Sequence, residues 1–355
     1  MEKFCVFCGN KPKNKNNEHI IPKWLIELTG DSNRTADFGP IWNSKTQNLE
    51  FRKFAFDQFQ FPACEDCNIK YSDFETKAKN IVEKLLNEEE LNNEDFSVFL
   101  DWLDKIRVGL WLGYNYLQKN LSDVYPNYHI SKRIGIKDRA IFIYKSDSKQ
   151  LGINFAGANT PAFQYLPTCF NLRINQFCFF NLSTDFLISK NLGLPYSKEA
   201  YYTDSQEIQF VVEGGRNRIL YPLIKIAYDK KCSEIYQSIY SHNIKSNIEY
   251  LYNNDYTKSI SKNFEKGIGK VLIAGNNKIR EYPTEPSKSW IPKNIWNLPE
   301  LIDMIGRQVL NSQIYFINKS AKYNNISLEK RNLIEQQLET AKSVNRMYLK
   351  FMNED

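Results

Sequence analysis

The stretch PACEDCN, residues 62–68, places two cysteines three positions apart and follows them with an asparagine. A matching pair lies near the N-terminus in CVFCG, residues 5–9. A CxxC turn lets two thiolates approach one ion, and two such turns give a tetrahedral four-sulfur set with metal–sulfur distances of about 2.3 Å. We therefore predict one structural zinc ion, bound by Cys5, Cys8, Cys64 and Cys67.

The composition is that of a globular chain. Of its 355 residues, 42% are hydrophobic and 25% are charged, and the length is enough for two or three domains. No run approaches the ~20 apolar residues of a membrane span, and the first residues lack the apolar segment of a signal peptide. We expect a cytoplasmic protein without a membrane partner. In that compartment, paired CxxC units indicate a metal site rather than disulfides.

The hydrophobic pattern predicts an α+β fold in two parts. A small cysteine-bearing module covers residues 1–90, and a larger mixed α+β domain covers residues 91–355. Helical spacing begins at Ser72, and the almost wholly apolar segment 96–117 predicts a buried helix. Strand-like segments follow, and helical spacing returns toward the C-terminus. The strand segments are 139–145, 152–157, 163–175, 176–183, 207–215 and 218–228, and the later helical ones are 245–254, 295–318 and 327–352.

A second motif lies between the two cysteine pairs. In NNEHIIPKWL, residues 16–25, Glu18 directly precedes His19, which is one of only three histidines. The order CxxCG, EHIIP, CxxCN resembles the HNH endonuclease family, whose site is a zinc-bearing ββα-metal fold. The resemblance covers about the first fifth of the chain. It implies that His19 is the general base and that Glu18 and Asn68 are ligands of one catalytic divalent ion.

These residue types suit the hydrolysis of a phosphodiester. The negative charge of the phosphodiester repels hydroxide, so the reaction needs charge neutralisation together with an activated water. Carboxylate and amide oxygens form a site that suits Mg²⁺ or Mn²⁺, and an imidazole, with an ordinary pKa of about 6.5, accepts a proton at neutral pH. Adjacent strand residues point to opposite faces. Joint action of Glu18 and His19 therefore requires a local distortion or a ligand that reaches around the strand edge.

Each assignment has a structural alternative. His19 is otherwise a hydrogen-bonded, half-buried histidine, Glu18 a solvated acid, and Asn68 the N-cap of the following helix. The sequence also departs from the family, because Tyr71 and Ser72 stand where another ligand is often found. Glu75, one turn further along, is a candidate ligand of the same ion. Alternatively, it is an acid in the first helical turn, where the helix dipole stabilises negative charge. Asn48 is the nearest match to the asparagine that steadies the base.

The module also carries an excess of lysine. Lysines can contact phosphates without reading sequence, so the excess favours a nucleic-acid partner, with DNA expected over RNA. Trp24 either stacks on a base or anchors the small core of the module. The lysines concerned are Lys11, Lys13, Lys15, Lys23 and Lys70.

We therefore expect a metal-dependent HNH-type endonuclease that is controlled or targeted by residues 91–355. The resemblance implies a bacterial role in restriction or phage defence. One alternative is a zinc-stabilised DNA-binding module without catalysis. Another is a nuclease gated by a small ligand or a phage protein that the larger domain senses.

Overall fold

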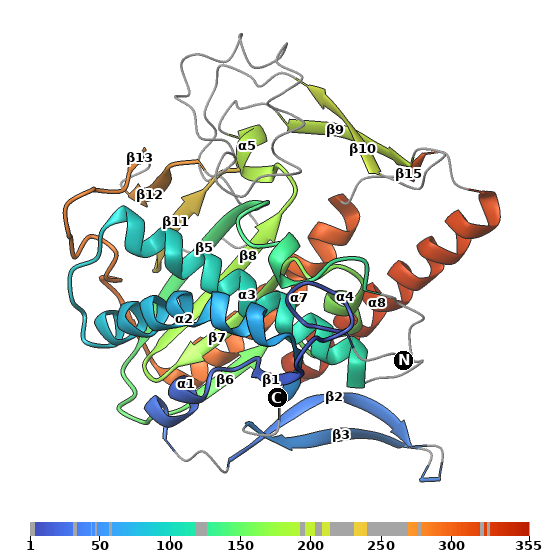
Figure 1. Ribbon diagram of the computed structural model, residues 1–355, viewed down its shortest axis with the longest axis horizontal. Helices are drawn as coiled ribbons and strands as arrows, with labels where there is room; N and C mark the ends of the chain where they lie inside the picture. The colour runs from blue at the N-terminus through green and yellow to red at the C-terminus, as the bar shows by residue number, and fades with distance from the viewer. Residues whose placement is uncertain are drawn as a thin grey trace.

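The computed structural model describes residues 4–30, 34–43, 45–46, 48–56, 59–117, 126–191, 196–202, 208–213, 231–239, 269–275, 278–319, 323–324 and 327–354. It is a mixed α+β structure (Figure 1). The expected segments at residues 218–228 and 245–254 lie outside the described residues. Among those described, no helix combines the length and the apolar composition needed to cross a membrane.

The N-terminal part is built as two paired strands followed by a helix. Strand β1 (Asn16–His19) pairs antiparallel with β4 (Gln60–Ala63), and helix α2 (Glu65–Leu86) follows β4 directly. Between the two strands lie helix α1 (Lys23–Leu28) and the hairpin of β2 (Thr35–Asn43) and β3 (Asn48–Ala55). The hairpin extends from the body of the molecule at the bottom of Figure 1.

The larger part is organised around an eight-stranded sheet. Its strands run in the order β13, β12, β11, β5, β8, β7, β6, with each neighbour antiparallel, while β14 pairs parallel with β5. The bounds are β5 Asp138–Ser146, β6 Ile153–Ala156, β7 Cys169–Ile174, β8 Phe177–Thr184, β11 Ser233–Gln237, β12 Val271–Gly275, β13 Lys278–Glu281 and β14 Ile295–Trp296.

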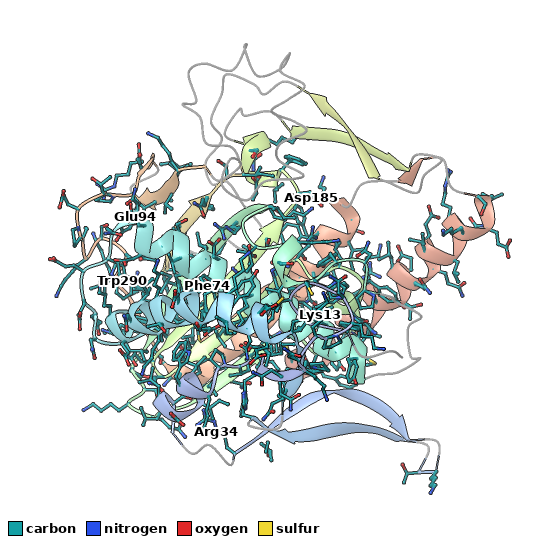
Figure 2. The ribbon with its side chains drawn as sticks, in the orientation of Figure 1. Lys13, Arg34, Phe74, Glu94, Asp185 and Trp290 are labelled. Carbon is teal, nitrogen blue, oxygen red and sulfur yellow. The ribbon has the colours of Figure 1, made fainter. Side chains whose placement is uncertain are left out.

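Successive side chains of each strand point to opposite faces of this sheet, and both faces are apolar. Helices therefore cover both faces. Ile141 and Ile143 of β5 share a core with α3 (Asn93–Leu117), which lies beside α2, while Phe142 packs with α7 (Leu298–Lys319). Figure 2 draws the described side chains on the same ribbon. The remaining elements are η2 Ile130–Lys132, α4 Pro161–Tyr165, α5 Leu187–Asn191, β9 Tyr196–Tyr202, β10 Ile208–Glu213, β15 Tyr323–Asn324 and α8 Leu328–Glu354.

Several boundaries differ from the sequence-based expectations. Helix α2 begins at Glu65 rather than Ser72, because Cys64 is its N-cap in an extended conformation and two acids occupy its first turn. The expected strand 163–175 begins with helix α4, which Thr160 caps by accepting a hydrogen bond from the Phe163 amide. The hairpin β2–β3 and the strands β11, β12 and β13 were not predicted. The segments of β11, β12 and β13 are short, and those of β2 and β3 lack a clear alternating pattern.

The N-terminal strands dock on two glycines of α3. A Cβ at Gly109 would lie 2.7 Å from Ile20 Cγ2, and one at Gly113 would lie 2.6 Å from Phe59 Cζ and 2.9 Å from Phe61 Cζ. All three distances are shorter than a carbon–carbon contact allows. The side chains from the N-terminal part therefore pack onto bare backbone, and the core is continuous from Cys5 to the sheet.

Replacement of Gly113 by valine tests this docking. The added methyl groups meet two packed aromatic rings, so we expect a loss of about 2 kcal/mol in the free energy of unfolding. Chemical denaturation of the full chain measures it. Gly275→Val is the matched control, because nothing lies within 4 Å of a Cβ at that position. Equal stability of the two variants would contradict the proposed packing.

Candidate functional site

The four predicted cysteines come together into one cluster. Their sulfur atoms all lie within 4.8 Å of one another, and Cys8 Sγ is 4.0 Å from Cys64 Sγ. Tetrahedral coordination at a zinc–sulfur distance of about 2.3 Å requires sulfur atoms about 3.8 Å apart. The spacing therefore fits a structural metal ion such as zinc, and Cys5, Cys8, Cys64 and Cys67 would bind it.

The ionisation of the thiols agrees with this fit. Burial opposes ionisation of Cys5, but hydrogen bonds from the backbone of Cys8 and Cys64 outweigh it and lower the pKa of Cys5. Burial and the nearby negative charge of Cys5 raise the pKa of the Cys67 thiol. Four sulfurs this close resist joint ionisation, and a divalent cation removes that conflict.

Backbone contacts hold the two cysteine turns together. The Cys64 amide donates to Cys5 Sγ at 3.2 Å, and the Lys13 amide donates to Cys64 Sγ at 3.4 Å. The larger part of the chain supports the first turn, because the Ile130 and Ser131 amides donate to the carbonyls of Val6 and Phe7. The cluster therefore joins three segments distant in sequence.

His19 is the last residue of β1 and is half-buried. Its cross-strand partner in the register is Gln60, whose Nε2 lies 2.9 Å from His19 Nε2. Asn48, the expected steadying residue, is the first residue of β3, and nothing is described of its side chain. The residue that contacts the His19 ring is thus Gln60, which the sequence analysis missed.

Glu18 points into the protein, on the opposite side of the strand from His19. It is 9% exposed, and its Oε1 accepts a hydrogen bond from Lys105 Nζ at 2.6 Å. The β1–β4 register is regular from Asn16 to His19, so no distortion brings Glu18 and His19 to one face. Glu18 is therefore neither a solvated acid nor aligned with His19.

Lys105 of α3 also pairs with Glu75 of α2, through Oε1 of that carboxylate. Oε2 of Glu75 accepts from Trp24 Nε1 at 3.1 Å. Burial lowers the pKa of Lys105, but the charges of Glu75 and Glu18 outweigh it and raise the pKa. The ammonium therefore stays protonated at neutral pH and bridges two carboxylates.

The positions of Asn68 and Glu75 decide two of the alternatives. Asn68 lies in the first turn of α2 and its amide bonds to the Cys64 carbonyl, so Asn68 is not the N-cap. Within the described residues its side chain makes no hydrogen bond. Glu75 lies well beyond the first turn of α2, so the helix dipole does not stabilise its charge. Tyr71 stacks on Phe7, with ring centroids 4.4 Å apart, and contributes to the core.

The fit of a catalytic divalent ion is partial. Oε2 of Glu18 has no hydrogen-bond partner in the described part of the chain, whereas both oxygens of Glu75 accept hydrogen bonds. Apart from the four cysteines, the described residues contain no group of three or more His, Cys, Asp or Glu side chains placed to share an ion. Glu18 Oε2 and the Asn68 side chain are thus the available ligand atoms, and both roles stay predictions.

The lysines and the tryptophan have different environments. Trp24 is half-buried, and its ring centroid lies 5.7 Å from that of Trp102, so it is a core anchor. The lysines are exposed, and Lys13, labelled in Figure 2, belongs to the segment between the first cysteine turn and β1. These exposed residues are Lys11, Lys13, Lys15, Lys23 and Lys70.

No protein-family model, curated protein or solved structure matches the chain. The HNH resemblance therefore rests on the sequence motifs, and the structure adds only that the four cysteines lie close enough to bind one metal ion. Sequence reasoning missed Lys105 because the apolar pattern of its helix gives a lysine there no visible partner. The only available signal was a lone lysine within a segment predicted to be buried.

Proposed function

We propose that this protein is a zinc-stabilised, metal-dependent nuclease that hydrolyses phosphodiester bonds, with DNA as the expected substrate. One observation carries the proposal. Two antiparallel strands lead directly into a helix, with His19 ending the first strand and Asn68 in the first turn of the helix. The cysteine cluster spans the same elements and fixes the start of the helix. This order of elements is the one that the HNH resemblance implies.

The residues divide into three roles in this proposal. His19 accepts the proton of the attacking water, and Glu18 Oε2 with the Asn68 side chain would hold a Mg²⁺ or Mn²⁺ ion. Because Glu18 and His19 lie on opposite faces of β1, this assignment requires the ion and the attacking water to meet at the end of the strand, where His19 stands. The ion would neutralise charge on the phosphate as the bond breaks. The exposed lysines contact the backbone of the nucleic acid. A role in phage defence or restriction, under control of residues 91–355, belongs to the same proposal and rests on the resemblance.

Gln60 sets which nitrogen of His19 is available. A general base needs one ring nitrogen without a proton, and the other must then donate. As placed, the Gln60 amide nitrogen donates to His19 Nε2, and Nδ1 then carries the ring proton. With the amide oxygen facing Nε2 instead, Nε2 carries the proton and Nδ1 is left to accept one. A half-turn of the Gln60 amide exchanges its oxygen and nitrogen at the same 2.9 Å contact. Gln60 thereby orients the ring for catalysis.

A second candidate function is a zinc-stabilised nucleic-acid-binding module without catalysis. The ion pair between Lys105 and Glu18 favours this second candidate, because the Glu18 carboxylate already has a cationic partner. In this alternative Glu18 and Lys105 hold the fold, and His19 and the lysines contact phosphate. The two candidates differ in one measurable property, which is metal-dependent strand cleavage.

A plasmid-cleavage assay tests the proposal. We expect the purified full chain to nick or linearise DNA with Mg²⁺ or Mn²⁺ and to leave it intact with EDTA, because the phosphate needs a divalent counter-charge. Single-stranded DNA and RNA are assayed in parallel. Binding to nucleic acid without cleavage of any of these substrates, under every metal tested, would establish the binding module instead.

A further inference from the structure

Lys105 of α3 is buried where strand β1, helix α2 and the first cysteine turn meet. Its side chain is 1% exposed, and its ammonium contacts Glu18 of β1 and Glu75 of α2. The same nitrogen lies 5.8 Å from the ring centroid of Phe7, inside the first cysteine turn. Helix α3 therefore places a fixed positive charge directly behind the strand that ends at His19.

The charge balance of these residues limits how they can bind a cation. Glu18, Glu75 and Lys105 together carry a net charge of −1, because one ammonium offsets one of two carboxylates. A divalent ion at Glu18 Oε2 would bring the group to +1, and one phosphodiester would return it to neutrality. Coulomb repulsion between a lysine charge and a divalent ion bound to the same group of side chains weakens binding of the ion by about tenfold, even with the screening of bulk water.

We propose that Lys105 is a positioning residue that holds Glu18 and Glu75 in place and keeps the site from binding a divalent ion tightly unless a phosphate is present. The inference rests on the proposed function, because it concerns the ion of that same site. Glu18 is nine-tenths buried with one unpartnered oxygen, so the ligand atom exists, and the lysine charge behind it sets its affinity. Metal loading is thereby coupled to arrival of nucleic acid.

The test measures Mn²⁺ binding by calorimetry on the zinc-loaded full chain, without nucleic acid, at pH 8. Lys105→Met removes the charge but keeps an unbranched side chain of similar length. We expect Mn²⁺ to bind at least tenfold tighter to this variant than to wild type. Lys105→Arg keeps the charge and is expected to bind Mn²⁺ as wild type does.

Two further variants complete a charge cycle around the same site. Glu75→Gln lowers the negative charge and is expected to bind Mn²⁺ more weakly than wild type, whereas Lys105→Met/Glu75→Gln restores the net charge of −1 and the affinity of wild type. If Lys105→Met does not fold, because two buried carboxylates lose their cation, the comparison of Glu75→Gln with the double variant measures the same lysine effect.

The inference is overturned if removal of the lysine charge changes the Mn²⁺ affinity by less than about twofold, comparing Lys105→Met with wild type or the double variant with Glu75→Gln. Lys105 would then be a purely structural residue. The outcome is separable from that of the proposed function. Wild type that cuts DNA, with no lysine effect on Mn²⁺ binding, rejects the inference alone. A charge cycle that holds, in a protein that cuts no nucleic acid, rejects the nuclease proposal alone.

Discussion

Replacement of His19 by alanine is expected to abolish most cleavage while leaving the fold, the zinc and nucleic-acid binding intact. His19 is half-buried at the end of β1, and its ring contacts Gln60 rather than either group of metal ligands. Loss of a general base costs ~100- to 10,000-fold in rate. Single-turnover cleavage measures this loss, and the residual rate is expected to rise with pH as hydroxide replaces the missing base.

His19→Gln is the informative companion variant. It preserves polarity and much of the side-chain size without basicity, so we expect it to be as inactive as His19→Ala. Exposed Glu27→Ala, in helix α1 just after this motif, is the control for nonspecific damage and should retain most of the cleavage rate. A His19→Ala protein that cuts within threefold of wild type would remove His19 from the reaction.

Replacement of Cys64 by serine is expected to remove the metal and unfold the N-terminal part. Cys64 is both a ligand of the cluster and the N-cap residue of α2, and it is packed in the core. A structural zinc of this kind contributes about 10–16 kcal/mol of apparent binding free energy, which in such sites is folding free energy. Elemental analysis should fall from about one zinc per chain to near zero, with a large drop in the melting temperature.

Cys232→Ser is the control for the cysteine experiment. Cys232 is half-buried and lies outside the cluster, so its replacement should leave the zinc content unchanged. Wild-type protein purified without chelators yet free of zinc, or a Cys64→Ser protein that retains it, would show that the cluster is not a zinc site.

Parts of the fold follow from local pattern. The apolar segment 96–117 forms most of the buried helix α3, and the segments expected as strands at residues 139–145 and 176–183 lie in β5 and β8. These three predictions are correct because a helix buried on all sides, or a strand in the centre of a sheet, has a continuous apolar sequence. The start of α2 was misplaced because Cys64, a member of the four-cysteine cluster, is the N-cap, and its side chain makes no capping hydrogen bond that a sequence pattern would indicate.

The cysteine set is determined by the sequence alone, because a CxxC turn fixes two ligands locally and one ion needs two such turns. The partners of the EH motif are decided only by the tertiary structure. Gln60 meets His19 across 41 residues through strand register, and Lys105 meets Glu18 across 87 residues through the packing of α3. Hydrophobic periodicity indicates which face of a strand or helix is buried, but it does not indicate which distant residue that face meets. The charge behind Glu18 therefore depends on which helix packs there, and no motif encodes it.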